Sequence, residues 1–380
     1  MGNQPNAPLD LPDDRLGRLE ISAGRHVTVG QRTSVAATTT LVQISVRSSQ
    51  SRFNARAAGL LLGFVADRAF ADPGRFHPVA GFGTAAIALQ KMSYRDSRAA
   101  GTLHVAVLLA GTAGLGLTAE AASRRAGWVA VTGTTAIATW AVLGGTSLAR
   151  TGIDMAARLE ASQVDGDLTT ARELLPSLCG RDPSVLGEEG LTRAALESVA
   201  ENTSDATVGA VFWGAIAGVP GLFVYRAANT LDAMIGYRSE KYLRFGWAAA
   251  RFDDLVNIVP ARLTGALTAA CAPVVGGSVQ ESLAAWKRDA AAHPSPNAGV
   301  AEASAAGALG ISLGGRTEYA HGVEMRPVLG RGPVPTPNDL RRAARLSSAV
   351  QISAAVVSAG ISAGIAVSIG KFGFLRRERH

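Results

Sequence analysis

Long apolar runs constrain the fold of this chain most, because a helix needs about 20 apolar residues to cross the hydrocarbon core of a membrane. Three runs have this character nearly throughout: residues 102–119, 127–149 and 346–370. Three more are shorter or interrupted by polar residues: 57–66, 206–228 and 255–275. The sequence therefore predicts an all-α protein, a polytopic helical bundle in the cytoplasmic membrane, whose polar regions 150–205 and 277–345 form cytoplasmic helices and loops.

The composition agrees with this fold class. Of 380 residues, 47% are hydrophobic and only 18% are charged, which is less charge than a soluble domain usually carries. The net charge of +7 fits the positive-inside rule, or the binding of anionic substrates by arginine. No basic run alternates with aromatic residues, so nucleic acid is not expected as a partner. Cys179 and Cys271 lie too far apart to predict a metal or disulfide framework.

The first 52 residues differ from the rest of the chain. They are polar and rich in Ser, Thr, Gly and Pro, and we predict a disordered extension with at most a strand over 39–46. Residues 53–380 are predicted to form one membrane-embedded domain that carries the function.

An acidic stripe precedes the run at 206–228. Glu197, Glu201 and Asp205 are spaced by four, so on a helix they share one face. Like charges at this spacing destabilise a helix slightly unless a cation lies among them. Mg²⁺ prefers such oxygen ligands, usually completed by substrate phosphates. The pattern predicts either a magnesium site or a solvated helix face.

A denser polar cluster follows the same run. Tyr225, Asn229 and Asp232 share a helix face with Gly236, and Arg226 neighbours Asn229 at a spacing of three. Ionisable groups at membrane depth are costly and usually mark a functional site. The alternative is a polar cap on a helix that leaves the bilayer.

Two further clusters contain charged residues beside apolar runs. Asp253 and Asn257 share a face, and Arg262 lies seven residues inside the run that begins at residue 255. We expect Arg262 to face a polar cavity or a partner such as Asp254, because lipid exposure would cost several kcal/mol. Near the first apolar run, His77 lies in the loop ADRAFADPGRFHPVAGFG, where it is either functional or incidental to a capped loop.

Residues 206–228 are predicted to form a re-entrant hairpin instead of a full span. If every apolar run crossed the membrane, the acidic stripe and the cluster that begins at Tyr225 would face opposite compartments. The segment Gly218-Val219-Pro220-Gly221 permits a turn, since proline breaks a regular helix and glycine relaxes the backbone. Non-helical backbone is tolerated at this depth where it lines a cavity in the protein.

Four segments, in the order of the chain, resemble the adenosylcobinamide-phosphate synthase family of cobalamin biosynthesis (the CobD/CbiB type). These segments are HPVAGFG, AENTSD, YRAANTLDAMIGYRSEKYLRFGWAAARFDDLVNIVPARLTG and SPNAGVAEASAAGALGISLGG. The resemblance covers about residues 57–345. Arg226 and Arg238 stand where many relatives would have lysine, and Ala206 and Ala233 replace a common Gly and Ser.

The resemblance implies an enzyme that forms an amide bond. Family members join aminopropanol, generally as its O-phosphate, to the propionate carboxylate of adenosylcobyric acid. ATP and Mg²⁺ are the implied means of activating that carboxylate. The implied partners are these two substrates, the lipid bilayer and, as further candidates, other late enzymes of the cobalamin pathway.

The clusters and the resemblance together predict the site residues. Catalytic roles are predicted for His77, Glu201, Asp205, Asp232, Arg251 and Asp254, with His77 as the base that deprotonates the incoming ammonium. The predicted ligands of Mg²⁺ are Glu197, Glu201 and Asp205. Substrate binding is predicted for Asn202, Tyr225, Arg226, Asn229, Thr230, Tyr237, Arg238, Tyr242, Arg244, Asn257, Arg262 and Asn297.

Two other classes of function stay open from the residues alone. Intramembrane Arg and Asp beside a broken helix are also features of transporters, although no second, inverted copy of the polar block is present. A non-catalytic membrane scaffold for corrinoid enzymes would explain the spans but not the density of Asn, Asp, Arg and Tyr.

Overall fold

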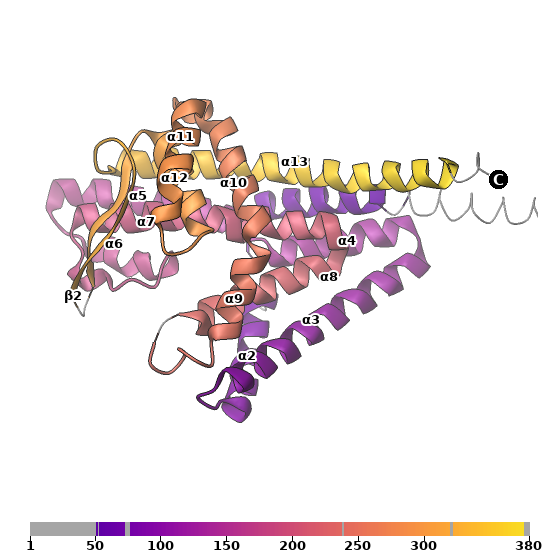
Figure 1. Cartoon of the computed structure of the whole chain (residues 1–380). Coiled ribbons are helices and arrows are strands. Elements are labelled where there is room, and N and C mark those ends of the chain that lie inside the picture. Colours follow the sequence, from indigo (N-terminus) through magenta and orange to yellow (C-terminus); the bar gives the residue numbers. More distant parts are fainter. Residues whose placement is uncertain (1–50, 52, 73–76, 238, 320–321, 376–380) are drawn as a thin grey trace, which may run out of the picture. The chain divides into compact units, whose positions relative to one another are not determined.

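The structure is a computed structural model that describes residues 51, 53–72, 77–237, 239–319 and 322–375 (Figure 1). All of them belong to one unit of the chain, Val46–His380. The predicted N-terminal extension, apart from Ser51, and the strand considered at 39–46 lie outside the described residues.

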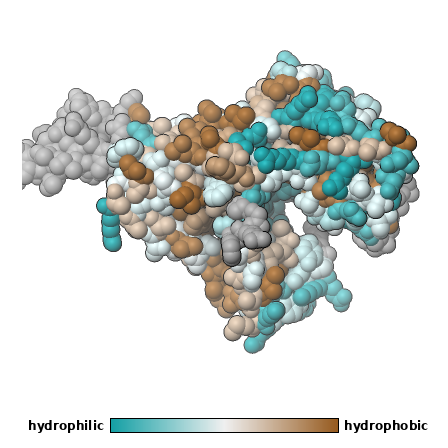
Figure 2. Space-filling model, turned by 180° about the vertical axis from the view of Figure 1, so that it is seen from behind, coloured by the Kyte–Doolittle hydropathy of each residue, from teal (hydrophilic) through white to brown (hydrophobic). Residues whose placement is uncertain are grey.

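Long apolar helices dominate the described part of the chain, and the predicted helical membrane bundle is confirmed. Five segments are long and apolar enough to cross a membrane: Arg98–Ala126, Trp128–Asp165, Glu188–Gly236, Ile258–Val275 and Pro337–Ile365. They contain α3 (Arg98–Ala126), α4 (Trp128–Val142), α5 (Gly145–Asp165), α7 (Glu188–Thr203), α8 (Gly209–Leu231), α10 (Ile258–Cys271) and most of α13 (Pro337–Leu375). In Figure 2, hydrophobic residues cover much of the middle of the molecule, and hydrophilic residues gather most densely at the upper right, over the end that carries α6 and α11.

Shorter elements connect the long helices. The remaining α-helices are one over residues 53–70, α2 (Pro78–Ser93), α6 (Thr169–Leu174), α9 (Trp247–Val256), α11 (Val279–Asp289) and α12 (Ala298–Leu309). Single 3₁₀ turns occur at Leu175–Ser177, Pro183–Val185, Ala272–Val275 and Ala290–Ala292, and π turns at Ser204–Val208 and Asp232–Gly236. Strands β1 (Ser312–Tyr319) and β2 (Gly322–Gly330) pair antiparallel. This small hairpin was not foreseen, since 277–345 was predicted as helix and loops.

The predicted span at 127–149 is interrupted at residues 143 and 144, where the chain passes from α4 to α5. Gly144 has a non-helical conformation, and its N–H donates to the Ala206 carbonyl at 3.2 Å. Asp67 caps the new helix, because its carboxylate accepts from the N–H and hydroxyl of Thr146 at 3.2 and 2.7 Å. Side-chain acceptors at a helix N-terminus satisfy N–H groups that have no partner within the helix.

The segment around α8 folds back on itself, as predicted for 206–228. Gly218 has φ 70° and ψ −148°, a conformation open almost only to glycine. The Tyr225 ring packs so closely against Gly209 that a Cβ there would lie 2.1 Å from the ring's Cζ. In a continuous helix these residues would be about 24 Å apart along the axis, so the two arms of α8 run antiparallel. Pro220 lies in the first turn of the second arm, where its missing N–H costs nothing.

Polar groups at the tip of this hairpin hold it in place. The Arg56 guanidinium donates to the carbonyls of Ala215 and Ile216, both at 3.4 Å, and to Glu120 at 2.8 Å. These carbonyls end the first arm and would otherwise lack donors. The tip is thus anchored by an ion pair between the helix over 53–70 and α3.

Candidate active site

The fold-back brings the two polar clusters of the sequence together. Asp205, in the π turn before α8, accepts a hydrogen bond from the Asn229 amide on the second arm at 3.1 Å. These residues would be about 36 Å apart along a straight helix. The hairpin therefore places the end of the acidic stripe and the face of Asn229 and Asp232 at one site.

An amide and carboxylate network extends from this contact to α9. Asn229 also lies within hydrogen-bonding reach of Asp253, and Asn257 donates to Asp253 at 3.0 Å. The buried Tyr225 hydroxyl donates to the Asn257 amide oxygen at 2.7 Å. Tyr225 thus holds Asn257 in place and does not line either cavity, contrary to its predicted role in substrate binding. The predicted shared face of Asp253 and Asn257 is confirmed.

Five carboxylates surround a small cavity of about 190 Å³ beside this network. They are Glu201, Asp205, Asp232, Asp253 and Asp254. Burial raises the pKa of Asp253 to about 7, and the nearby Asp232 charge contributes to the rise. The Oδ1 atom of Asp253 is buried and has no hydrogen-bond partner. A cluster of this kind attracts a cation, because like charges in a buried place repel one another without one.

Glu197 is not part of this carboxylate cluster, which corrects its prediction as a metal ligand. Its carboxylate is 2% exposed and forms ion pairs with Arg181 and with Arg326, the latter at 3.0 Å. It also accepts the Gly314 N–H at 2.8 Å. With both oxygens engaged, Glu197 positions two arginines, whereas Glu201 and Asp205 belong to the carboxylate cluster.

A larger cavity of about 660 Å³ adjoins the small one and shares Glu201, Asp205 and Asp232 with it. Arg181 and Arg326 lie in its lining with Glu197. Arg326 comes from β2, opposite Gly315 of β1, so the small strand hairpin supplies part of the wall. The cavity therefore has a basic wall and a carboxylate-lined wall.

His293 and Glu302 line the same cavity beside the two arginines of the basic wall. Arg326 Nη2 lies 2.7 Å from His293 Nε2, and a guanidinium only donates. The Nε2 atom therefore accepts, while Nδ1 lies 3.1 Å from the Ser295 carbonyl oxygen and 3.0 Å from the Ser295 nitrogen. Burial and the Arg326 charge lower the pKa of His293. Burial, together with Glu197 and Glu201, raises the pKa of Glu302 well above its ordinary value.

The carboxylate cavity offers one or two carboxylate ligands for Mg²⁺, and not a complete set of protein ligands. No group of three His, Cys, Asp or Glu side chains in the described ranges is arranged to hold a metal ion. Mg²⁺ is, however, often bound by one or two carboxylates, with waters and substrate phosphates completing its shell. Asp205 and Asp253, which share Asn229, and the unpartnered Asp253 oxygen fit that role.

Arg262 has a different partner from the one proposed. Its guanidinium donates to the Asn297 amide oxygen at 2.6 Å, and not to Asp254. Asn297 in turn donates to the Asp254 main-chain carbonyl at 2.8 Å. Arg262 is therefore held in a polar contact, as expected, and it orients Asn297 at the edge of the small cavity.

Several predicted residues line these two cavities and others do not. Those that do are Glu197, Glu201, Asn202, Asp205, Asn229, Asp232, Asp254, Asn257 and Asn297. Tyr237, Arg244 and Arg251 lie at the surface, and Arg244 and Arg251 are about two-thirds exposed. Tyr242 is half-buried and accepts a hydrogen bond from Gln90 of α2 at 2.9 Å. Arg238 lies outside the described residues.

His77 caps α2 instead of lining either cavity. Its Nδ1 accepts the Val79 N–H at 3.2 Å, and its Nε2 lies 3.9 Å from Asp72. The predicted role as the base at the carboxylate cluster therefore does not fit its position. The alternative that the sequence left open was a capped loop in which the histidine is incidental.

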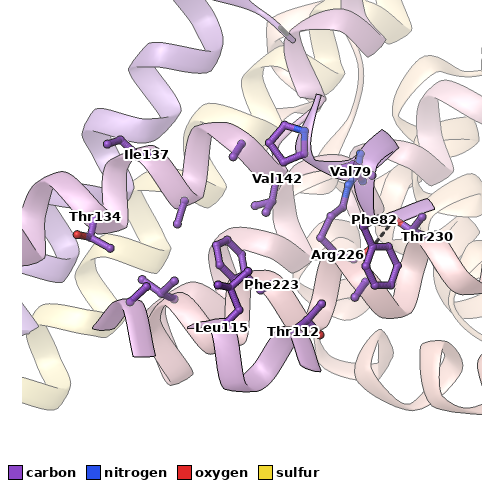
Figure 3. Close-up of a pocket in the computed structure, with 16 residues that line it drawn as sticks. Val79, Phe82, Thr112, Leu115, Thr134, Ile137, Val142, Phe223, Arg226 and Thr230 are labelled. Atoms are coloured by element: carbon purple, nitrogen blue, oxygen red, sulfur yellow. Dashed lines mark hydrogen bonds between the residues drawn. The ribbon is translucent and has the colours of Figure 1, made fainter. Parts of the chain in front are cut away.

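Arg226 and Thr230 face a third, apolar cavity between α2, α3, α4 and the second arm of α8 (Figure 3). The Arg226 guanidinium also approaches the Asn229 amide oxygen at 3.5 Å. Arg226 thus lies at the boundary between this apolar cavity and the polar site.

The sequence reasoning missed the residues of the basic wall and the role of Asp253. Glu302 had a local signal, since it is the lone charge in the fully buried α12. His293 lies two residues before Ser295, where a segment that carries the resemblance begins. Arg181 and Arg326 had none, because they meet Glu197 across tertiary contacts.

Comparison with known proteins identifies the family. A family model described as CobD/Cbib protein matches residues 60–347. The chain belongs to the CobD/CbiB family. A cobalamin biosynthesis protein CobD of Mycobacterium tuberculosis is 56% identical over 308 residues, 81% of this chain and 96% of the relative. A protein of the same name from Chromobacterium violaceum is 39% identical over 80% of this chain and 98% of the relative. Another, from Geobacter metallireducens, is 40% identical over 72% of this chain and 86% of the relative. No solved structure matches the chain significantly.

The family membership makes this chain a protein of cobalamin biosynthesis, and the fold makes it a multi-pass membrane protein by the character of its helices. The family model covers the chain from within the helix over 53–70 to within α13. All the cavity-lining residues described above lie within the matched range.

Proposed function

We propose that the chain is an adenosylcobinamide-phosphate synthase, a membrane ligase that uses ATP to join aminopropanol phosphate to the propionate carboxylate of adenosylcobyric acid. The observation that carries the proposal is the 660 Å³ cavity with arginines on one wall and carboxylates on another. Aminopropanol phosphate has a phosphate at one end and an ammonium at the other, so its charges complement these walls. A cavity of this size suits a small ligand or a substrate arm.

In this proposal the chain's own residues act by placing charges. Arg181 and Arg326, oriented by Glu197, would bind phosphate oxygens with their planar forks. Asp232 and Glu201 would receive the ammonium group and direct its nitrogen toward the propionate. Most of the rate enhancement would come from holding the two reactants together and from stabilising charge in the transition state.

The amine must lose a proton before it can attack, and His293 is the best-placed base in this proposal. Its Nε2 atom carries the lone pair and lies at the cavity wall. When a phosphate takes over Arg326, Nε2 would become available to accept that proton. Mg²⁺, held by Asp205 and Asp253, would neutralise the phosphates of ATP during activation of the carboxylate.

Turnover by the purified protein tests the proposal. The protein in lipid nanodiscs receives adenosylcobyric acid, aminopropanol phosphate, ATP and Mg²⁺, and the corrinoid product is identified by its mass. We expect the amide product, its loss in excess chelator, and slow turnover by Asp232→Ala at normal yield and melting temperature. A parallel reaction with free aminopropanol shows which form of the amine is the substrate.

The transporter and scaffold alternatives give different results in the same system. Uptake of a corrinoid into proteoliposomes without a covalent product would favour transport. Neither uptake nor product, from a protein with native melting behaviour, would favour a scaffold. Turnover that persists unchanged in excess chelator would remove Mg²⁺ from the mechanism.

A further inference from the structure

The apolar cavity described above has about 610 Å³ of space and is not used by the proposed reaction (Figure 3). Its lining comes from α2, α3, α4 and the second arm of α8, and is almost entirely apolar. Arg226 is the single charged side chain among the residues that line it. This combination of an apolar body and one charged end suggests an amphiphilic occupant.

The cavity opens toward the surface that faces lipid. Leu115 of α3 and Ile137 of α4 both line it, and they are 61% and 67% exposed. They lie on candidate spanning segments, so in a membrane their exposed side chains contact the hydrocarbon of the bilayer. A molecule of the membrane can enter sideways between α3 and α4 without crossing water.

The cavity is polar at one end and apolar at the other, as a phospholipid is. Arg226 and Thr230 lie near the end of the second arm, close to the polar site, whereas Phe223 and Val219 lie progressively nearer the tip. From Val219 to Thr230 the arm rises about 16 Å. Half of a bilayer's hydrocarbon core is about 15 Å thick, so one acyl chain matches this length.

The charged end has an unsatisfied donor. The Arg226 Nε atom is buried and has no hydrogen-bond partner, and the guanidinium otherwise approaches Asn229 at a long 3.5 Å. Asp72 and Asp205 lie near enough to interact with it electrostatically, and Asp205 is already hydrogen-bonded to Asn229. An unpaired buried donor costs free energy, which a phosphate oxygen would recover.

We propose that this cavity binds one phospholipid of the surrounding bilayer, with an acyl chain between α3, α4 and α8 and its phosphate at Arg226. The inference does not depend on the proposed ligase activity. Because Arg226 also touches Asn229, the bound lipid would lie one side chain away from the carboxylate cavity.

Lipid retention by the purified protein tests the proposal. The protein is washed in mild detergent, and native mass spectrometry counts the phospholipids that remain on each chain. Ala141→Trp fills the cavity from α4, and Thr134→Trp is a second plug nearer its far end. Val129→Trp, at a 63% exposed position of α4 that is not among the lining residues, is the matched control.

We expect one retained phospholipid on the wild type and on Val129→Trp, and none on either plug variant. Added dioleoyl-phosphatidylglycerol should raise the melting temperature of the wild type more than dioleoylglycerol does. Arg226→Gln should weaken phosphatidylglycerol binding about tenfold, or about 1.4 kcal/mol, and remove this preference for the phosphate. Equal lipid retention by the wild type and both plug variants, or no difference between the two lipids in the wild type, would overturn the proposal.

Discussion

Gly218→Ala tests whether the turn in α8 requires glycine. Gly218 has φ 70° and ψ −148°, and a residue with a Cβ pays about 1–3 kcal/mol to adopt such a conformation. The added Cβ would also lie 2.5 Å from Glu120 Oε2 and 2.6 Å from Arg56 Nη2. Overpacking of this kind costs about 1–3 kcal/mol, while the stiffer unfolded chain returns about 0.4–1 kcal/mol.

Together these effects predict a loss of about 1–6 kcal/mol in the free energy of unfolding. Equilibrium unfolding in mixed micelles, followed by circular dichroism, measures it. Gly114→Ala in α3 is the matched control, because a Cβ there meets nothing within 4 Å. The control should be neutral or slightly more stable, since alanine favours a helix over glycine.

Ligation should fall together with stability in Gly218→Ala, because the turn determines where Asn229 meets Asp205. A variant as stable and as active as the wild type would refute the reasoning. It would mean that the chain reverses direction without the strained conformation at residue 218. A similar loss in Gly114→Ala would also refute it, since the cost would then not arise from the turn.

Three further predictions concern the same hairpin and site. Tyr225→Phe should lower the free energy of unfolding by about 1–3 kcal/mol, because a buried amide oxygen loses its donor; an unchanged unfolding curve would contradict this. Single cysteines at Ser184 and Glu240, in a cysteine-free background, should react with an impermeant thiol reagent from the same side of the membrane, and a cysteine at Ala126 from the other. Opposite labelling of the first two positions would contradict a re-entrant hairpin. Because the pKa of Asp253 is raised to about 7, its carboxylate ionises as the pH rises through that value, so the half-saturating Mg²⁺ concentration should fall; a pH-independent value would exclude Asp253 as a ligand.

Local sequence signals were sufficient for the long apolar segments and for the fold-back, but not for the interruption at residues 143 and 144. Long apolar runs predict membrane-spanning helices, and Gly218 and Pro220 predict a break in the backbone within the run at 206–228. The spacing of Asp253 and Asn257 also predicted their shared face, since both positions belong to one helix.

Long-range pairings were beyond local patterns. Glu197 looked like a ligand because its spacing from Glu201 is helical, but its actual partners are 16 and 129 positions away in the sequence. Arg226 and Asn229 are neighbours as predicted, yet only the packing of α3 and α4 decides that Arg226 borders an apolar cavity. The exposed Arg244 and Arg251 show the same limit, because charge alone does not reveal which side of a helix or loop is covered.

The rate of amide formation by Asp253→Asn, compared with wild type, tests the central claim that the carboxylate cavity at the base of the hairpin takes part in ligation. Asp154→Asn, on the exposed side of α5, is the matched control, and all three proteins are compared at equal yield and melting temperature. We predict that the wild type and the control make the amide from adenosylcobyric acid and aminopropanol phosphate, and that Asp253→Asn is slower by about 100-fold or more, the loss of about 2.7 kcal/mol typical of removing a group that stabilises transition-state charge. Full activity in Asp253→Asn would move the reaction away from this cavity, and no amide from the wild type would contradict the account itself.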